Sequence, residues 1–143
     1  MMKLRRLFAA LLLTVAVVAP AIACSCIMPD GSRSDHVRRE FKQAEYVFSA
    51  YVASVYRSEG PDSRRMVKLR VLQVWKGDLA ANTWLEVESD GDSGTGCGLA
   101  VDADTAILAY TSGHALHSCS MTGRLDRATQ DIPLLNKLAA ARK

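Results

Sequence analysis

The sequence lacks the short motifs by which common catalytic and nucleotide-binding sites are recognised. It contains no phosphate-binding loop, and neither Ser93 nor Ser120 stands in a G-x-S-x-G nucleophile elbow. His114 and His117 form an H-x-x-H pair, but on the strand expected there this spacing directs the two rings to opposite faces. These residues predict a protein that is not an enzyme and that has no cofactor or metal of its own.

An excess of charge of one sign is also missing once the first 23 residues are set aside. The whole chain has 18 Lys and Arg against 15 Asp and Glu, a net charge of +3. Three of the basic residues lie in the first 23 positions, so residues 24–143 carry 15 charges of each sign. This balance argues against a nucleic-acid-binding surface. We interpret Trp75 and Trp84 as barrel or helix-docking residues rather than as a stacking platform.

No hydrophobic run is long enough to span a bilayer comfortably. The apolar segment 7–18 follows a basic start, and the small-residue triplet Ala21-Ile22-Ala23 follows it. This pattern is typical of a secretory signal peptide. We therefore expect residues 1–23 to be a signal peptide and residues 24–143 to form a single secreted or periplasmic domain.

The cysteines lack the paired C-x-x-C spacing of a four-cysteine zinc site. All four, Cys24, Cys26, Cys97 and Cys119, follow the signal peptide, and an even number in a small exported domain predicts disulfides. A bond between Cys24 and Cys26 would close too tight a ring. Two pairings therefore remain open, each joining the N-terminus to both later cysteines, and each bridge would stabilise the fold by on the order of 4 kcal/mol.

Short alternating segments predict a mainly β domain. We expect strands at 46–56, 66–75, 83–87, 105–111 and 115–119, separated by turns. Five strands of this kind predict an OB-type antiparallel barrel, whose closure removes exposed sheet edges. The stretch from Asp90 to Gly96 is expected to be a solvated acidic turn, since Val101 stands where a calcium loop would place its closing glutamate.

One helix is expected before the barrel strands in the sequence and one after them. A short N-terminal helix is predicted to start at a Ser34 cap, with Val37 and Phe41 on its apolar face. A C-terminal helix is predicted to start at an Asp131 cap, with Leu135 on its apolar stripe. Each helix is apolar on one face only and must pack against the rest of the fold.

The ordered set of these features resembles the netrin-like fold, and within it the N-terminal domain of the tissue inhibitors of metalloproteinases. The matching segments are, in chain order, Cys24-Ser25-Cys26, Val47–Val52, Val74-Trp75-Lys76-Gly77, Cys97-Gly98, Ala106–Ala109 and Cys119-Ser120. The resemblance covers nearly all of residues 24–127, although the chain has no cysteines for the third disulfide of the inhibitors. It implies the disulfides Cys24–Cys97 and Cys26–Cys119.

The resemblance also implies a function for the new N-terminus. The α-amine and carbonyl of Cys24 would chelate the zinc of a metalloprotease, because a catalytic zinc keeps one coordination position open. Ser25 would point into the protease pocket beside the metal, and Thr95 and Gly96 of the loop before Cys97 would flank it. The expected partner is therefore a zinc metalloprotease, and we expect the inhibitor to be a monomer.

Two alternatives stay open. Ala21-Ile22-Ala23-Cys24 is also a degenerate lipobox, with Ala21 where leucine is usual. A lipid on Cys24 would make the chain an envelope lipoprotein anchored to a membrane, and it would leave one of the other cysteines unpaired. Netrin-like domains also serve as interaction modules without inhibitory activity, an alternative that rests on the fold alone.

Overall fold

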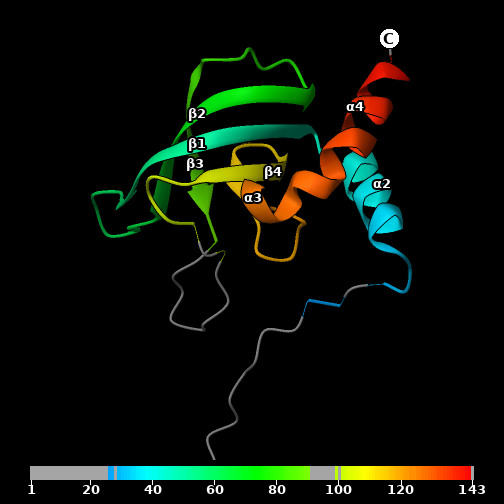
Figure 1. Ribbon diagram of the computed structural model, residues 1–143. Coiled ribbons are helices and arrows are strands. Elements are labelled where there is room, and N and C mark those ends of the chain that lie inside the picture. The colour runs from blue at the N-terminus through cyan, green and yellow to red at the C-terminus, as the bar shows by residue number, and fades with distance from the viewer. Residues whose placement is uncertain (1–25, 28, 91–98, 100, 143) are drawn as a thin grey trace, which may run out of the picture.

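The computed structural model describes residues 26–27, 29–90, 99 and 101–142, and it is mainly β (Figure 1). The elements in chain order are α2 (Arg33–Gln43), β1 (Tyr46–Arg57), β2 (Arg65–Lys76), β3 (Trp84–Ser89), β4 (Ala106–Ser112), β5 (Ala115–Leu116), β6 (Gly123–Arg124), α3 (Leu125–Ala128), the 3-10 turn η1 (Thr129–Asp131) and α4 (Ile132–Ala140). The fold class expected from the sequence is confirmed: a five-stranded barrel compatible with the OB type, with an N-terminal and a C-terminal helix.

The barrel closes because β4 pairs with β1 at one end of the strand order β1-β2-β3-β5-β4. Neighbouring strands are antiparallel except β3 and β5, which run parallel where Glu88 and Ser89 face Ala115 and Leu116. The sequence had led us to expect a wholly antiparallel barrel, but the barrel is mixed. The reason is topological, since a closed ring with an odd number of strands cannot alternate direction at every step. The short β6 adds a sixth strand beside β4.

The final barrel strand is shorter than expected. β5 ends at Leu116 instead of continuing to Cys119, because the chain turns at His117, whose carbonyl accepts hydrogen bonds from the backbone N–H (3.2 Å) and hydroxyl (2.8 Å) of Ser120. The sequence also did not predict β6 or α3, whose two and four residues are too short to show periodicity. β1, in contrast, is twelve residues long and contains three register shifts against β2, which bend it around the barrel.

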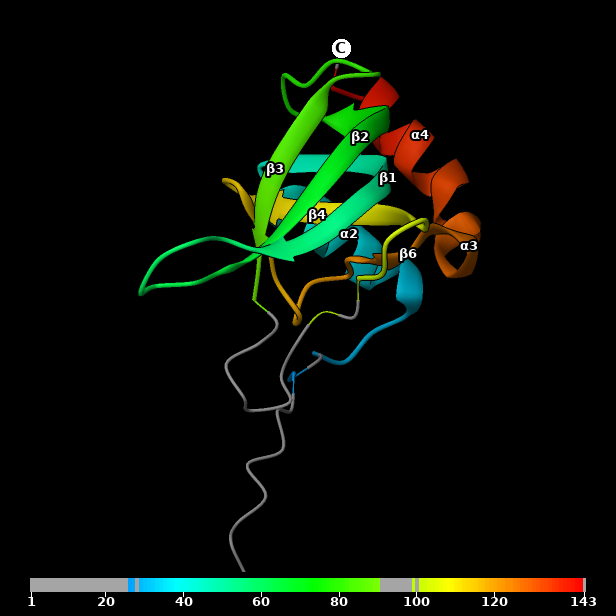
Figure 2. The same cartoon turned by 90° about the vertical axis from the view of Figure 1, so that its left-hand side faces the viewer.

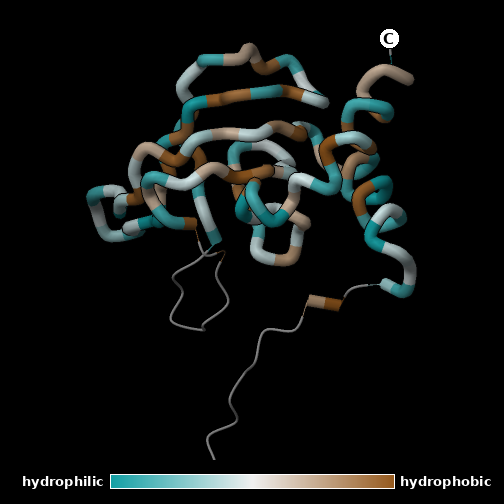
Figure 3. Tube along the Cα trace, viewed as in Figure 1, coloured by the Kyte–Doolittle hydropathy of each residue, from teal (hydrophilic) through white to brown (hydrophobic). Residues whose placement is uncertain are grey.

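The barrel interior is an apolar core to which every barrel strand contributes. Its buried residues are Phe48, Ala50, Val52, Val67, Leu69, Val71, Val87, Leu99, Val101, Ile107, Ala109 and Leu116. Figure 3 shows hydrophobic and hydrophilic residues interspersed along the strands, which is the pattern expected when one face of a strand is buried. This core fixes the strand registers, and through them the positions of the described connections at the barrel ends.

A second apolar cluster, here called the helical layer, lies between the helices and the outside of the barrel. Its buried residues are Val37, Phe41, Ala44, Val47, Trp75, Leu108, Tyr110, Ala128 and Leu135. The helix α2 begins two residues earlier than predicted, because its N-cap is Ser32 and not Ser34. The Ser32 hydroxyl accepts from the Asp35 N–H at 3.3 Å, and the Asp35 carboxylate accepts from the Ser32 N–H at 3.0 Å. In the described part of the chain, every helix is too short or too polar to cross a membrane.

Asp131 does not cap α4 with its side chain, contrary to the prediction. Its carboxylate is buried and accepts two hydrogen bonds from the Arg33 guanidinium, both of 2.8 Å. The pair joins the first residue of α2 to the residue before α4, 98 positions away. Asp131 therefore fixes one helix against the other. A buried carboxylate is more stable when an arginine pairs with it than when it faces only a helix end.

The segment Trp75-Lys76-Gly77 connects the barrel to both helices. The Trp75 indole donates to the Asn136 side-chain oxygen of α4 at 2.7 Å, which confirms Trp75 as a helix-docking residue. The Lys76 ammonium donates to the Phe41 carbonyl at 2.8 Å and so satisfies the C-terminal end of α2. Gly77 adopts a positive φ of 99°, and a Cβ there would overlap the ring of Tyr46. These contacts give a physical reason for a W-K-G sequence at the end of β2.

Candidate functional site

The disulfide between Cys26 and Cys119 fastens the N-terminal segment to the barrel. It joins residues 93 positions apart, with a Cα–Cα distance of 5.2 Å, and both cysteines are exposed. Its formation confirms this one of the two bonds that the resemblance implied. The bond thus attaches Cys26 to the turn after β5.

The same turn also contacts Asp90, the last described residue before the segment that contains Thr95 and Gly96. Asp90 follows β3 directly, and its two carboxylate oxygens accept from the Ser118 N–H at 2.9 and 3.0 Å. The His117 ring nitrogen lies 3.5 Å from the same carboxylate. Asp90 is thus a specific anchor, and not only the solvated acidic residue that the sequence suggested. Residues 117–119 therefore contact two separate parts of the chain: Cys26 in the N-terminal segment, and Asp90 at the end of β3.

The chain is anchored again where it leaves this loop. Leu99 and Val101 are buried in the barrel core. The guanidinium of Arg65, at the start of β2, donates to the Leu99 carbonyl at 3.2 Å and to the Val101 carbonyl at 2.9 Å. An arginine that bonds two backbone carbonyls, two residues apart, fixes their direction as well as their place. The residues flanking the loop are therefore held on both sides, at Asp90 and at Leu99.

The remaining predicted site residues lie outside the described part of the chain. These are Cys24, Ser25, Thr95, Gly96 and Cys97. The Cys24–Cys97 bond and the roles given to the other three therefore stay predictions. What the structure brings together is the framework that adjoins them: Cys26, Asp90 and the turn 117–120.

Two recesses border the disulfide, and sequence reasoning did not find them. One, of about 200 Å³, lies between Ile27, Cys119 and the α2 residues His36 and Arg39. The other, of about 250 Å³, lies between the β4–β5 region and α2. Glu40 and Gln43 line both. No sequence motif marks these residues, since they share a surface only because α2 packs beside the turn after β5.

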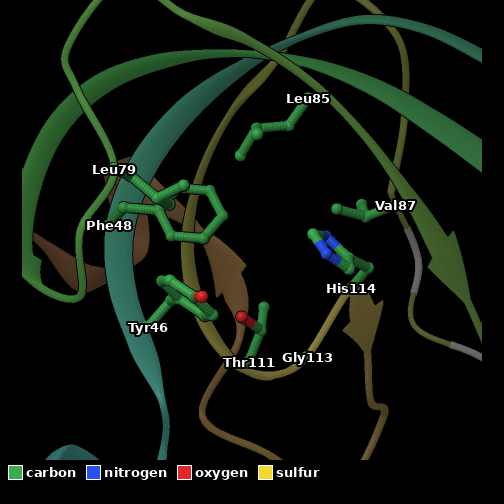
Figure 4. A pocket seen from close by; sticks show the side chains of 8 residues that line it. All are labelled: Tyr46, Phe48, Leu79, Leu85, Val87, Thr111, Gly113 and His114. Atoms are coloured by element: carbon green, nitrogen blue, oxygen red, sulfur yellow. The ribbon is translucent and has the colours of Figure 1, made fainter.

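A third recess opens at the end of the barrel (Figure 4). Apolar side chains from β1 and β3 line most of it, with Tyr46 and the His114 ring at its rim. Its volume is about 20 Å³, which is room for about one water molecule. His114 and His117 therefore have different surroundings: His114 lines this recess, and His117 contacts Asp90. Within the described residues, no cluster of three or more potential metal ligands occurs.

Comparison with known proteins gives no family for the chain, since neither any protein-family model nor any curated protein matches it.

Proposed function

We propose that the chain is a secreted inhibitor of zinc metalloproteases that uses the α-amine and carbonyl of Cys24 as a chelate for the protease zinc. The observation that carries the proposal is the double attachment at residues 117–119. This turn is bonded to Cys26 through the disulfide and to Asp90 through hydrogen bonds. The residues next to both segments that would contact a protease are therefore attached to this one turn.

The chemistry of the chelate requires a neutral amine and a fixed geometry. An α-amine has a reference pKa of about 7.7–8.0, so a neutral amine is available near neutral pH. A free chain end would lose conformational entropy on binding the metal. The Cys26–Cys119 bond removes part of this cost in advance, because it restricts the chain two residues from the amine. A second bond from Cys24 to Cys97 would remove most of the remainder.

The critical experiment adds one alanine before Cys24 in the mature protein and measures inhibition of a panel of zinc endopeptidases. We expect the extended form to lose at least about 100-fold in affinity, because the amine is then displaced from the metal. A matched control adds the alanine after Lys143 and retains full inhibition. Both variants should keep the melting temperature of the parent. An extended form that inhibits as well as the parent would rule out the chelate.

Mass spectrometry of the mature N-terminus distinguishes the alternatives. A free amine on a disulfide-bonded Cys24 is the expected result. An acyl mass on Cys24 would make the chain a lipoprotein, with no amine available for zinc. A free amine without inhibition of any zinc endopeptidase would leave the interaction module as the explanation.

A further inference from the structure

The outer face of β1, β2 and β3 packs on the helices at Val47 and Trp75. Away from these two residues, no described helix lies over the three strands (Figure 2). The strand registers place Tyr51, Arg70 and Trp84 opposite one another in a row across the three strands. The next positions along the strands bring Lys68 and Glu86 beside this row. We call these five residues the three-strand face.

One large apolar side chain of this face is exposed, although the barrel has a closed apolar core. Trp84 is 55% exposed, the highest value for an aromatic side chain among the described residues. The Lys68 ammonium lies 5.5 Å from the centre of the Trp84 ring. Because more than half of the side chain still faces solvent, the indole offers a flat apolar surface for a ligand. Trp84 is therefore a barrel residue, as the sequence predicted, but one whose ring faces solvent.

The other end of the row is held in place. The Tyr51 hydroxyl donates to the Asp104 carboxylate at 2.6 Å, and the Arg70 guanidinium lies 6.0 Å from the centre of the Tyr51 ring. The aromatic side chain therefore orients the arginine, and Asp104 orients the aromatic side chain. A surface ordered in this way loses little entropy when it binds a ligand.

The charges on the face leave two cations available. Neither Lys68 nor Arg70 forms an ion pair within the described part of the chain, although Glu86 stands opposite Lys68. The next carboxylate along β3, Glu88, is occupied by Arg64 at 2.8 Å. A ligand that combines flat apolar surface with negative charge would match both properties of the face.

We propose that the three-strand face binds an acidic oligosaccharide whose sugar rings carry carboxylates. The apolar C–H face of one sugar would stack on Trp84, and the carboxylates would pair with Lys68 and Arg70. Tyr51 and Trp84 are two strand spacings apart, about 10 Å, which is enough for two sugar rings. The proposal does not depend on zinc chelation, because none of its residues belongs to the N-terminal site.

The test is calorimetric titration of the mature protein with a tetramer of galacturonic acid at low and moderate salt. We expect saturable binding that Trp84→Ala weakens by about tenfold or more, as is typical for the loss of one stacked ring. The double variant Lys68→Gln/Arg70→Gln should weaken binding and flatten its salt dependence. Leu72→Ala is the matched control, since Leu72 is 38% exposed on the same strand but is not in the row, and it should bind like the parent. Trp84 is a surface residue, so the variants should keep the parent's melting temperature.

Three results would overturn the proposal. The first is the absence of saturable binding to the acidic tetramer. The second is unchanged binding by Trp84→Ala, which would mean that charge alone attracts the sugar. The third is tighter binding of a single-stranded oligonucleotide, which would assign the face to a phosphate-bearing polymer instead. A neutral tetramer of the same length should bind more weakly than the acidic one.

Discussion

The barrel interior and the helical layer both bury apolar side chains, but different interactions hold them in place. Inside the barrel, the strand ladders fix every position, and the packing residues are almost entirely aliphatic. In the helical layer, a few polar contacts between distant residues determine how the helices sit. These are Arg33 with Asp131, Trp75 with Asn136, and Lys76 with the end of α2, at separations of 98, 61 and 35 positions. The barrel should therefore behave as a rigid unit and the helical layer as an attached one.

Matched leucine truncations give the largest effect and test this difference directly. Leu69 of β2 and Leu135 of α4 are both fully buried. We expect Leu69→Ala to lower the free energy of unfolding by about 4 kcal/mol and Leu135→Ala by about 2.5 kcal/mol. The reason is that β2 is hydrogen-bonded on both sides and cannot move into a cavity, whereas a helix packed on one face can shift. Chemical denaturation of the oxidised protein measures both, and equal losses would contradict the comparison.

Removing the charge of Asp131 should have the next largest effect. Asp131→Asn keeps the shape but leaves the Arg33 guanidinium without its carboxylate, so we expect a loss of about 2 kcal/mol. The matched control is Asp126→Asn, which breaks the exposed pair between Arg124 and Asp126. That variant should unfold at the same denaturant concentration as the parent. If both variants behave alike, the buried pair does not hold the helical layer.

A smaller effect is expected where the layer meets the barrel strand β2. Trp75→Phe removes the 2.7 Å hydrogen bond to Asn136, and Asn136→Ala removes the acceptor. Each should cost about 1 kcal/mol, and the double variant should cost clearly less than the sum of the two. Trp84→Phe is the control, because Trp84 is exposed and its indole forms no hydrogen bond with another described residue, so this change should leave stability unchanged. Full additivity of the two changes would show that the bond contributes nothing.

The sequence predicted the barrel well because strand periodicity is a local signal. The positions of β1 to β4 follow from alternating residues and turn signals, with boundaries within two residues of those observed. The parallel pair of β3 and β5 could not be found in this way, because it depends on how the ring closes. The two-residue strands β5 and β6 are too short to carry a pattern.

The candidate site was predictable only in part. One disulfide followed from the resemblance, while the contact of Asp90 with Ser118 joins residues 28 positions apart that no motif connects. Asp131 was misassigned for the same kind of reason. A carboxylate before a helix is locally a good cap, but here the carboxylate binds Arg33, which is distant in the sequence, instead of the helix N-terminus. Local patterns thus describe the barrel better than they describe the contacts around it.

The smallest effect at neutral pH concerns Tyr110, whose hydroxyl is buried in the helical layer and has no hydrogen-bond partner among the described residues. Burial raises the pKa of Tyr110, and the nearby carboxylates Asp131 and Glu40 raise it further. Tyr110→Phe should therefore leave stability at pH 7 unchanged or raise it by up to about 1 kcal/mol, since the lost group is an unpaired buried one.

At alkaline pH the stabilities of the parent and of Tyr110→Phe should differ, and the difference tests how tightly the helical layer is packed compared with the barrel interior. In the unfolded chain Tyr110 ionises above pH 10, its ordinary value, whereas in the folded chain the raised pKa keeps it neutral. Folding therefore carries no ionisation cost for Tyr110 below about pH 10, and a growing one as the pH rises above it. The parent should lose stability between pH 10 and 11.5 more steeply than Tyr110→Phe, as measured by urea denaturation at each pH. Parallel curves would mean that the hydroxyl reaches water in the folded protein, and that the helical layer is more loosely packed around β4 than its buried surface indicates.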